Sequence, residues 1–244
     1  MSSSPSLRLS LSIVSHGQWA LVRQLLDDLA RLSPPDIEVI LTANIPEEDY
    51  SYPTCPFPIR CIRNTTPKGF GANHNAAFRV ARGQYFAVVN PDIRLPTLDL
   101  ELLLRPLADP SVAAVAPVVL SVAGTVEDSV RCFPTISRLT RRVVLRQRAP
   151  DYQWGREPIS VDWAAGMFIA FRSEAYQAVG GFDDSRFFMY FEDVDICARL
   201  SKKGFRILLQ PQVSVIHDAR RDSHRSLKHL RWHLTSAVRY LSGF

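Results

Sequence analysis

The chain has 244 residues, a formal net charge of +5 and an apolar fraction of 46%. This length and composition are those of a globular protein with a substantial core, in one large domain or two small ones. The excess of basic residues favours acidic partners, namely phosphates, nucleic acid or anionic lipid, without choosing among them.

The cysteines and the apolar runs exclude several classes of protein. The four cysteines form no CxxC pair and no apolar leader precedes them, so we expect neither a zinc motif nor a disulfide framework. The apolar run over 112–122 is interrupted by Pro117 and is too short to span a bilayer. We therefore expect a cytosolic protein that contacts membranes only peripherally.

The first half of the chain alternates strand and helix patterns. Apolar and polar residues alternate over 7–13, and leucines recur at helical spacing over 19–32, before Pro34 and Pro35. Strands are predicted at 7–13, 37–41, 59–62 and 85–89, and helices at 19–32 and 72–81. This order is typical of a doubly wound α/β layer, in which ligands bind at the carboxyl ends of the strands.

The second half has a different order of elements. Strands are predicted at 112–120, 166–171, 205–209 and 213–216, and helices at 194–203 and 227–241. No internal repeat, low-complexity tract or clear linker is present. We therefore expect a single domain over 1–244 with two functional halves.

Two polar motifs directly follow predicted strands. Asn90-Pro91-Asp92 places a carboxylate where it can hold a divalent cation that bridges a diphosphate, although an Asx-Pro turn explains it without a metal. His217 has the imidazole needed to complete a metal site with Asp92, although a lone histidine is more often structural or solvent-facing.

A glycine-containing basic loop precedes the second predicted helix. Lys68-Gly69-Phe70-Gly71 suits close approach of the backbone to a phosphate at a helix N-terminus, but it matches neither GxGxxG nor GxxxxGKS. Asn73 and Asn75 on the first turns of that helix either cap it or face solvent.

Carboxylates and aromatic residues adjoin one another over 181–195. Gly181-Phe182-Asp183 is followed by the aromatic run 187–191 and then by Glu192, Asp193 and Asp195. A carboxylate in partly apolar surroundings is the usual setting of a catalytic base. The alternative is that these acids complement a helix dipole, and for Asp195, paired with Arg199 one turn later, we accept it.

A tryptophan and two basic segments are further candidates. Trp163 followed by Gly166 suits stacking on a sugar face, although tryptophan is commoner in a core. The last predicted helix combines a stripe of leucine and valine with basic residues, which favours an anionic membrane surface as much as a packed helix with a solvated face. The basic residues of the two segments are Arg138, Arg141, Arg142, Arg146, Arg148, Lys228, Arg231 and Arg239.

In their order, these motifs resemble family 2 glycosyltransferases with the GT-A fold, across nearly the whole chain. The residues that carry the resemblance are Val14-Ser15-His16-Gly17, Gly69-Phe70-Gly71 with Asn75, Asn90-Pro91-Asp92, Asp162-Trp163 with Gly166, Gly181-Phe182-Asp183, the run 188–195 and His217. The stretch 129–135 and the run 231–233 look closest to bacterial rhamnosyltransferases of O-antigen assembly. Those enzymes use dTDP-L-rhamnose and act on N-acetylglucosamine linked through diphosphate to a polyprenol.

The resemblance implies a Rossmann-like mixed central sheet flanked by helices, with a nucleotide-sugar-binding half (1–95) and an acceptor-binding, catalytic half (96–244). It implies a peripheral enzyme at the inner face of the plasma membrane, with a nucleotide-sugar donor, a polyprenyl-diphosphate-linked acceptor and no nucleic acid partner. It assigns Asp193 as general base with Glu192 beside it, and Asp92 and His217 as ligands of Mg²⁺ or Mn²⁺. It assigns nucleotide-sugar binding to Ser15, His16, Asn44, Lys68, Gly69, Asn75, Asn90 and Asp92, and acceptor binding to Trp163, Gly166 and Tyr190.

The chain departs from the family pattern at two positions. Relatives have Asp-Asn after the second strand where this chain has Ala43-Asn44, and the first position of the DxD-like motif is Asn90. A missing contact to the base or ribose and weaker metal binding are the expected consequences. The alternatives to a rhamnosyltransferase are a transferase that uses another nucleotide sugar, a silent nucleotide-sugar or lipid-binding module, and a nucleic-acid-binding protein, for which no motif is present.

Overall fold

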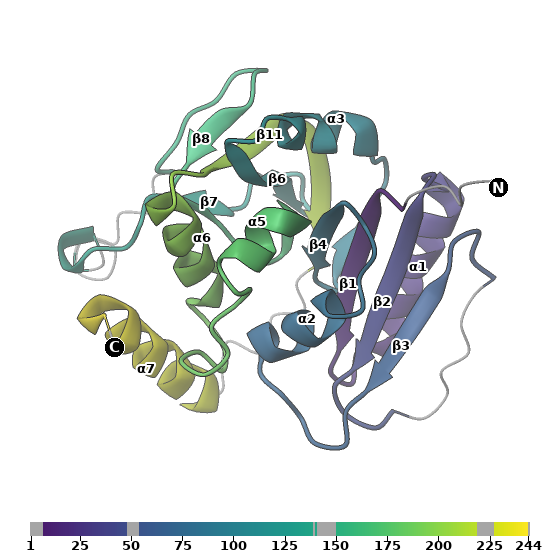
Figure 1. Ribbon diagram of the computed structural model, residues 1–244, viewed down its shortest axis with the longest axis horizontal. Helices are drawn as coiled ribbons and strands as arrows, with labels where there is room; N and C mark the ends of the chain where they lie inside the picture. Colours follow the sequence, from purple (N-terminus) through teal and green to yellow (C-terminus); the bar gives the residue numbers. More distant parts are fainter. Residues whose placement is uncertain (1–6, 48–53, 139, 141–149, 219–226, 244) are drawn as a thin grey trace.

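The computed structural model describes residues 7–47, 54–138, 140, 150–218 and 227–243. Its first half is built on four parallel strands, with β1 between β2 and β4 and with β3 beyond β2. Two helices accompany them on opposite faces (Figure 1). The elements are β1 (Leu9–Ser15), α1 (Trp19–Leu32), β2 (Ile37–Ala43), β3 (Ile59–Arg63), α2 (Phe70–Phe78) and β4 (Tyr85–Val89).

The second half extends the same sheet. Strand β10 pairs antiparallel with β4 and with β6, and this pairing joins the two halves. The remaining elements are β5 (Ile93–Arg94), α3 (Leu100–Leu104), the 3₁₀ turn η1 (Arg105–Ala108), β6 (Val112–Ser121), β7 (Val130–Arg131), β8 (Ile159–Val161), β9 (Trp163–Ala164), β10 (Phe168–Arg172), α5 (Ser173–Ala178), α6 (Glu192–Lys202), β11 (Arg206–His217) and α7 (Leu227–Ser242).

Within the described residues the central sheet has nine strands in the order β3-β2-β1-β4-β10-β6-β11-β5, with β8 paired to β11. A second ribbon consists of β7 and β9. The central sheet is mainly parallel, because β10, β5 and β8 pair antiparallel while the others run in one direction. This mixed α/β arrangement confirms the expected fold class.

Strand alternation divides the core between the two faces of the sheet. In β4, Tyr85, Ala87 and Val89 belong to one buried cluster, whereas Phe86 and Val88 belong to the other. The first cluster lies under α1 and α3, and the second lies under α2, α5 and α6. Because both faces are covered, the central strands are nearly continuous apolar runs.

The topology brings the ends of distant strands to one edge. Strands β1, β2, β4, β6 and β11 all end there, while the antiparallel β10 begins there. Ser15, Asn90 and His217 are therefore expected near one another, as is typical of ligand sites in open α/β sheets.

Two sequence-based predictions of elements need comment. The helix predicted at 19–32 is confirmed to the residue as α1. The prediction of two strands over 205–209 and 213–216 is wrong, because β11 is one strand with a bulge between Gln210 and Ser214, next to Pro211. All four cysteines are free thiols.

Candidate active site

Asp92 and His217 meet at the carboxyl edge of the sheet. Strand β5 pairs with the end of β11, so that Ile93 lies opposite His217, and the Asp218 N–H donates to the Asp92 carbonyl. The His217 Nε2 lies 3.2 Å from the Asp92 Oδ2, and its Nδ1 lies 2.8 Å from the Glu127 Oε2. The long-range strand pairing thus joins the two residues that the sequence places far apart.

These neighbours set the charge of His217. Burial alone would lower the pKa of His217, but the hydrogen bonds and negative charges of Asp92 and Glu127 outweigh it and raise this pKa to about 9. Glu127 also fixes the orientation of the ring, as carboxylates behind metal-binding histidines commonly do.

The Asp92–His217 pair fits a divalent cation. The Asp92 Oδ1 is buried without a hydrogen-bond partner, whereas its Oδ2 faces the imidazole nitrogen of His217. Carboxylate oxygen and imidazole nitrogen are both ordinary ligands of divalent metals. The described part of the chain has no group of three or more His, Cys, Asp or Glu side chains that could hold a metal. Two protein ligands would leave the other positions to diphosphate oxygens and water.

Helix α1 anchors the segment that carries Asp92. Asp28 accepts hydrogen bonds from the Arg94 Nε at 2.7 Å and Nη2 at 2.9 Å, and from the Leu95 N–H at 2.9 Å. Burial would raise the pKa of Asp28, but these bonds outweigh it and lower this pKa. This buried bidentate pair fixes β5, and with it the position of Asp92.

Asn44 holds together the loops at the ends of β1 and β2. Its Oδ1 accepts the Lys68 N–H at 2.8 Å and the Asn64 amide at 2.9 Å. Its Nδ2 donates to the Lys68 carbonyl at 3.0 Å and lies 3.1 Å from the His16 Nδ1. Because other protein groups already hydrogen-bond to the buried side-chain amide of Asn44, we interpret Asn44 as the residue that positions His16 and Lys68.

Glu47 is not one of the motif residues, and its carboxylate contacts the chain at the end of β1. Its Oε1 accepts the Ser15 hydroxyl at 2.5 Å and the Gly17 N–H at 3.0 Å, while its Oε2 accepts the Trp19 N–H at 3.0 Å. Gln18 provides no side-chain cap for α1, so this carboxylate satisfies the first N–H group of the helix. Nothing in the sequence pattern indicates this long-range cap.

The loop before α2 packs against the backbone of Phe188. The N–H of Phe70, the first residue of α2, donates to the Phe188 carbonyl at 3.0 Å. A Cβ on Gly69 would collide with the same carbonyl, which explains the glycine. Gly69 therefore has a packing role, and donor contacts of Gly69 and of the exposed Lys68 stay predictions.

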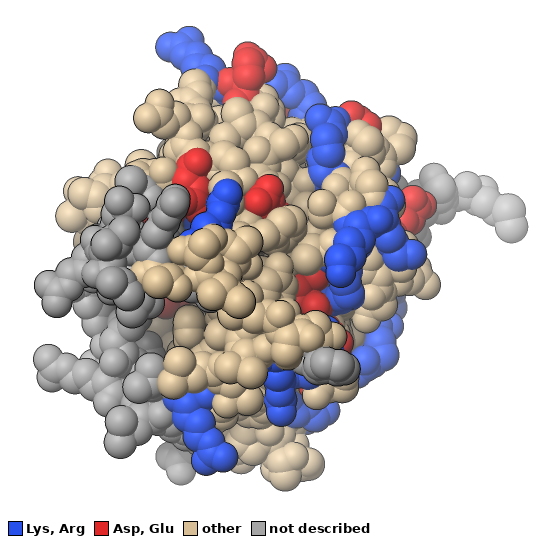
Figure 2. All heavy atoms as spheres, turned by 90° about the vertical axis from the view of Figure 1, so that its left-hand side faces the viewer, with Lys and Arg blue, Asp and Glu red and all other residues tan. Residues whose placement is uncertain are grey.

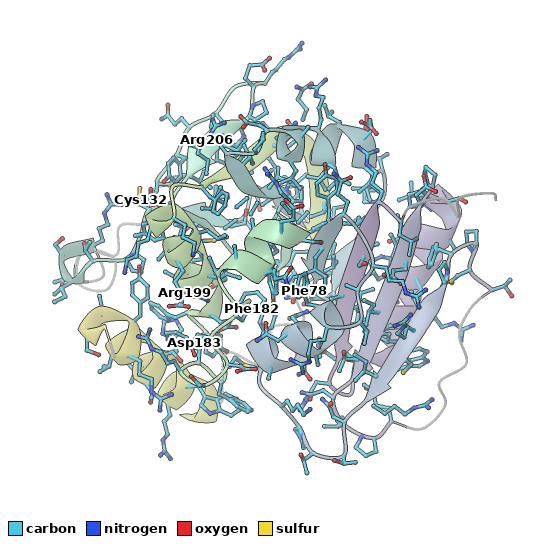
Figure 3. All side chains as sticks on the ribbon, in the orientation of Figure 1. Phe78, Cys132, Phe182, Asp183, Arg199 and Arg206 are labelled. Carbon is cyan, nitrogen blue, oxygen red and sulfur yellow. The ribbon has the colours of Figure 1, made fainter. Side chains whose placement is uncertain are left out.

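Asn75 is likewise committed to protein contacts. Its Oδ1 accepts the Phe182 N–H at 3.0 Å and the Tyr176 hydroxyl at 2.8 Å, and its Nδ2 donates to the Phe182 carbonyl at 2.8 Å. A neighbouring clamp uses Arg199, which pairs with Asp195 at 2.7 Å as predicted and donates to two loop carbonyls. Figure 3 shows Phe182, Asp183 and Arg199 in this region. We correct Asn75 from a donor-binding residue to one that holds the loop before α6.

Asp193 lies at the start of α6 and faces the same edge as Asp92. Its Oδ2 accepts the Gly166 N–H at 3.1 Å and its Oδ1 accepts the Val194 N–H at 2.8 Å. Met167, the residue after Gly166, accepts the Asn90 N–H at 2.9 Å, so a two-residue segment links the two acidic motifs. A Cβ on Gly166 would lie 2.9 Å from the Phe70 ring, so a larger residue there would displace that ring.

Burial makes both carboxyls at the start of α6 stronger bases. It raises the pKa of Asp193, against the opposing hydrogen bonds from Gly166 and Val194. Burial and the charge of Asp193 raise the pKa of Glu192 to about 8. The Glu192 Oε2 is buried without a hydrogen-bond partner, whereas Asp193 has two backbone donors and is partly exposed. Of the two carboxyls, that of Asp193 is therefore both accessible and held in a fixed orientation.

Helix α7 holds the backbone turn that leads to these carboxyls. Tyr190 and Phe191 have φ angles of 71° and 67°, a left-handed conformation that costs non-glycine residues about 1 kcal/mol or more each. The Ser236 hydroxyl donates to the Met189 carbonyl at 2.9 Å, and the His233 ring contacts the rings of Tyr190 and Phe191. The packing of α7 thus stabilises a strained turn that aims α6 at the site (Figure 1).

The aromatic run 187–191 is divided between core and surface. Phe187 and Phe191 are buried, so these two rings belong to the core. Phe188 is exposed and packs against Trp232, and Tyr190 is half-buried and packs against His233. Trp163 is also half-buried, and its Nε1 donates to the Cys132 carbonyl at 3.1 Å, which leaves its ring as the contact surface.

A hollow of about 600 Å³ lies elsewhere. It adjoins the first residues of β1 and β2, at the opposite end of those strands, and its lining includes Arg8, Pro34, Asp36 and Glu101. None of the predicted site residues lines it. The predicted site residues therefore lie at the carboxyl edge of the sheet and not in this cavity.

Comparison with known proteins identifies the family. Residues 10–177 match the model of Glycosyl transferase family 2. The chain belongs to this family. It is 34% identical over 187 residues to the rhamnosyltransferase WbbL of Escherichia coli K12, a match that covers 71% of this chain and 70% of WbbL. It is 31% identical over 166 residues to the N-acetylglucosaminyl-diphospho-decaprenol L-rhamnosyltransferase of Mycobacterium tuberculosis H37Rv, covering 64% of this chain and 54% of that protein.

Solved structures share the GT-A fold of this family 2 chain. GalNAc-T7 with UDP, GalNAc and Mn²⁺ superposes with a TM-score of 0.69 at 14% identity, covering 88% of this chain and 44% of its own. A second solved structure is the mannosyltransferase PcManGT of Pyrobaculum calidifontis in complex with GDP-Man and Mn²⁺. It superposes with a TM-score of 0.61 at 20% identity, covering 95% of this chain and 64% of its own. At these identities the likeness shows the fold alone.

Proposed function

We propose that this protein transfers L-rhamnose from dTDP-L-rhamnose, with inversion, to N-acetylglucosamine linked through diphosphate to a polyprenol, in O-antigen or related polysaccharide assembly. The observation that carries the proposal is the convergence of Asp92, His217 and Asp193 on one edge of the sheet, linked through Gly166 and Met167. The choice of rhamnose rests on the similarity to two rhamnosyltransferases.

In this proposal Asp193 removes the proton from the acceptor hydroxyl. The acceptor oxygen forms a bond to the anomeric carbon while the bond from that carbon to the diphosphate oxygen breaks, and the proton passes to the Asp193 carboxylate. The raised pKa of Asp193 makes it a better proton acceptor, and its two backbone hydrogen bonds fix its orientation. Attack on the face opposite the diphosphate inverts the configuration.

Asp92 and His217 act on the other side of the sugar in this proposal. They would hold Mg²⁺ or Mn²⁺, which when bound offsets the negative charge of the departing diphosphate. Glu127 orients His217, and the Asp28–Arg94 pair fixes the segment of Asp92. Asn44 and Glu47 hold the loops that carry the predicted donor contacts Ser15, His16 and Lys68.

The proposed acceptor is carried on a lipid, so we include peripheral contact with the cytoplasmic face of an anionic membrane. On α7, Leu234, Val238 and Leu241 are exposed, with Arg231 exposed beside them. Figure 2, which faces this side of the molecule, shows a broad uncharged surface with Lys and Arg side chains near its margins. None of the described helices is long and apolar enough to cross a membrane. Arg141, Arg142, Arg146, Arg148 and the side chain of Lys228 lie outside the described residues.

The test is a donor screen with the purified protein. dTDP-, UDP- and GDP-sugars are offered with a short-chain lipid-diphosphate N-acetylglucosamine acceptor and Mg²⁺ or Mn²⁺, and transfer is followed by mass spectrometry. We expect transfer from dTDP-L-rhamnose with inversion at the anomeric carbon. Transfer from another nucleotide sugar would overturn the donor assignment, and binding without transfer would indicate a silent module.

A matched pair of variants tests the base. Asp193→Asn should reduce kcat by ~10²–10⁴-fold while leaving nucleotide affinity unchanged, because only the proton acceptor is lost. Asp27→Asn, at an exposed carboxylate on α1, should keep near wild-type turnover. Near-normal turnover by Asp193→Asn would show that another group is the base.

A further inference from the structure

Arg131 lies beside Asp193 on the acceptor side of the site. In the β7–β9 ribbon Arg131 is paired with Trp163, and its guanidinium carbon lies 5.9 Å from the centre of the indole ring. The strand β9 leads to Gly166, whose N–H holds Asp193. The same ribbon therefore carries Arg131 and leads to the backbone N–H that binds the proposed base, Asp193.

The charge of Arg131 reaches two groups on different helices. It lowers the pKa of Asp193 on α6, against the dominant effect of burial, and it adds to burial in lowering the pKa of His233 on α7. The His233 ring lies 5.3 Å from that of Tyr190. Arg131 thus lies between the base and α7, in a region bordered by the half-buried rings of Trp163 and Tyr190.

The guanidinium retains hydrogen-bonding capacity for a ligand. Its Nη2 pairs with Asp128 at 2.7 Å, and both side chains are about one third exposed. Its Nε is buried and has no hydrogen-bond partner. Since a guanidinium has five N–H donors and the Arg131 side chain is about one third exposed, its exposed edge can donate to an anion in addition to Asp128.

The position of Arg131 shows which anion it would meet. The donor diphosphate belongs at Asp92 and His217, whereas the hydroxyl that attacks must lie against Asp193. An anionic group that binds Arg131 beside Asp193 is therefore assigned to the acceptor. In an acceptor whose sugar is joined to a diphosphate, the phosphate lies one sugar ring from that hydroxyl.

We propose that Arg131 binds the phosphate attached to the acceptor sugar and so selects a sugar diphosphate over an uncharged glycan end. This inference rests on the proposed function, because it places the acceptor against Asp193. The aromatic faces of Trp163 and Tyr190 border the sugar, and the guanidinium offers a fork of donors that matches phosphate oxygens.

The test compares two acceptors that differ only in charge. One is N-acetylglucosamine joined to a short lipid through diphosphate, and the other is the alkyl glycoside of the same sugar and lipid. For Arg131→Gln we expect kcat/KM to fall roughly 10- to 100-fold with the diphosphate acceptor and to change little with the glycoside. Arg131→Lys should recover part of the loss, and the exposed Arg156→Gln should behave as wild type.

The outcomes separate the possible roles of Arg131. An equal loss with both acceptors, accompanied by an upward shift of the acidic limb of the pH–rate profile, would mean that Arg131 acts only on the charge of Asp193. Unchanged preference for the diphosphate acceptor would overturn the proposal directly.

A binding measurement keeps this inference distinct from the proposed function. Calorimetric titration of the two acceptors into the wild-type and Arg131→Gln proteins needs no turnover. If the wild type transfers no sugar but its preference for the diphosphate ligand disappears in Arg131→Gln, the proposed donor fails and the assignment of Arg131 stands. If neither protein prefers the diphosphate ligand, the assignment of Arg131 fails whatever the donor is.

Discussion

The contact of His217 with two carboxylates makes proton binding and metal binding compete for one nitrogen. Asp92 and Glu127 raise the pKa of His217 to about 9 despite its burial. Below that pH the Nε2 carries a proton and cannot ligate a metal. Metal affinity at this site should therefore be a function of pH throughout the neutral range.

We predict that Mn²⁺ binding in the presence of nucleotide diphosphate tightens as pH rises from 6.5 to 9, by up to about tenfold per pH unit, and then levels off. Near pH 7.5 binding should release close to one proton. Calorimetry in two buffers with different ionisation enthalpies measures this release. His217→Gln should bind metal weakly and lose the pH dependence, whereas a wild-type affinity that stays flat with pH would contradict the metal assignment.

Glu192 differs from His217, because the effect of burial on its pKa is not outweighed by a neighbouring opposite charge among the described residues. Its pKa is raised to about 8, from an ordinary value of 4.5, first by burial and then by Asp193. A carboxyl whose pKa is higher in the folded state contributes stability in its protonated form. The free energy of unfolding therefore falls as pH rises between these two values.

Glu192→Gln should remove that loss. We expect the melting temperature of the variant to exceed that of the wild type by roughly 2–6 °C at pH 8 and by little at pH 5. Thermal unfolding at both values measures the difference, and Glu174→Gln, an exposed glutamate on α5, provides the matched control. The same temperature difference at the two pH values would show that ionisation of Glu192 is not the cause.

At the scale of elements, α2 and the loop before α6 form one unit. Asn75 bridges them through Phe182 and Tyr176, and the backbone of Phe188 caps the first N–H of α2. A glycine at position 69 permits this contact. The loop that presents Asp193 thus depends on a helix from the other half of the chain.

Asn75→Ala should therefore act on stability and turnover rather than on donor binding. Loss of several buried hydrogen bonds predicts a decrease of roughly 2–4 kcal/mol in the free energy of unfolding, measured in urea, and a lower kcat. Nucleotide affinity should stay within about twofold of the wild type. The exposed Gln177→Ala is the control. Strongly weakened nucleotide binding with unchanged stability would restore Asn75 as a donor contact.

The sequence predicts the elements whose pattern is local. Leucine spacing gives the bounds of α1, and apolar runs give β2 and β4. The two-residue strands β7 and β9 escape prediction, because each exists only through pairing with the other across a long stretch of chain. The bulge in β11 similarly reflects its pairing with β6 rather than any local pattern.

The same distinction applies to the site. The motifs indicate Asp92, His217 and Asp193, because their residue types and order are distinctive. They do not reveal Glu127 or Glu47, whose roles come from contacts between distant loops. Nor do they show that the amides of Asn44 and Asn75 are already paired, since only the folded chain brings their partners within reach.

For the whole molecule, α7 links the loop before α6 to the surface. Its inner side contacts that loop through Ser236 and His233, and its outer side exposes Leu234 and Val238, with exposed fractions of 58% and 64%. An apolar stripe flanked by arginine suits a membrane interface that carries anionic lipid. In this arrangement membrane contact would bring the acceptor-binding side of the site close to a lipid-linked substrate.

We predict that the protein floats with vesicles containing anionic lipid at low salt and that rising salt weakens the association. Replacing both Leu234 and Val238 by serine should reduce partitioning roughly tenfold or more, because two apolar side chains no longer enter the interface. Replacing Val122 and Val126, exposed apolar residues near the end of β6, should leave partitioning unchanged. The α7 variant should also lose activity on a long-chain acceptor in vesicles while keeping it on a short soluble one. Equal partitioning of both variants would exclude α7 as the contact face, and equal loss on both acceptors would show instead that the substitutions disturb the loop beneath the helix.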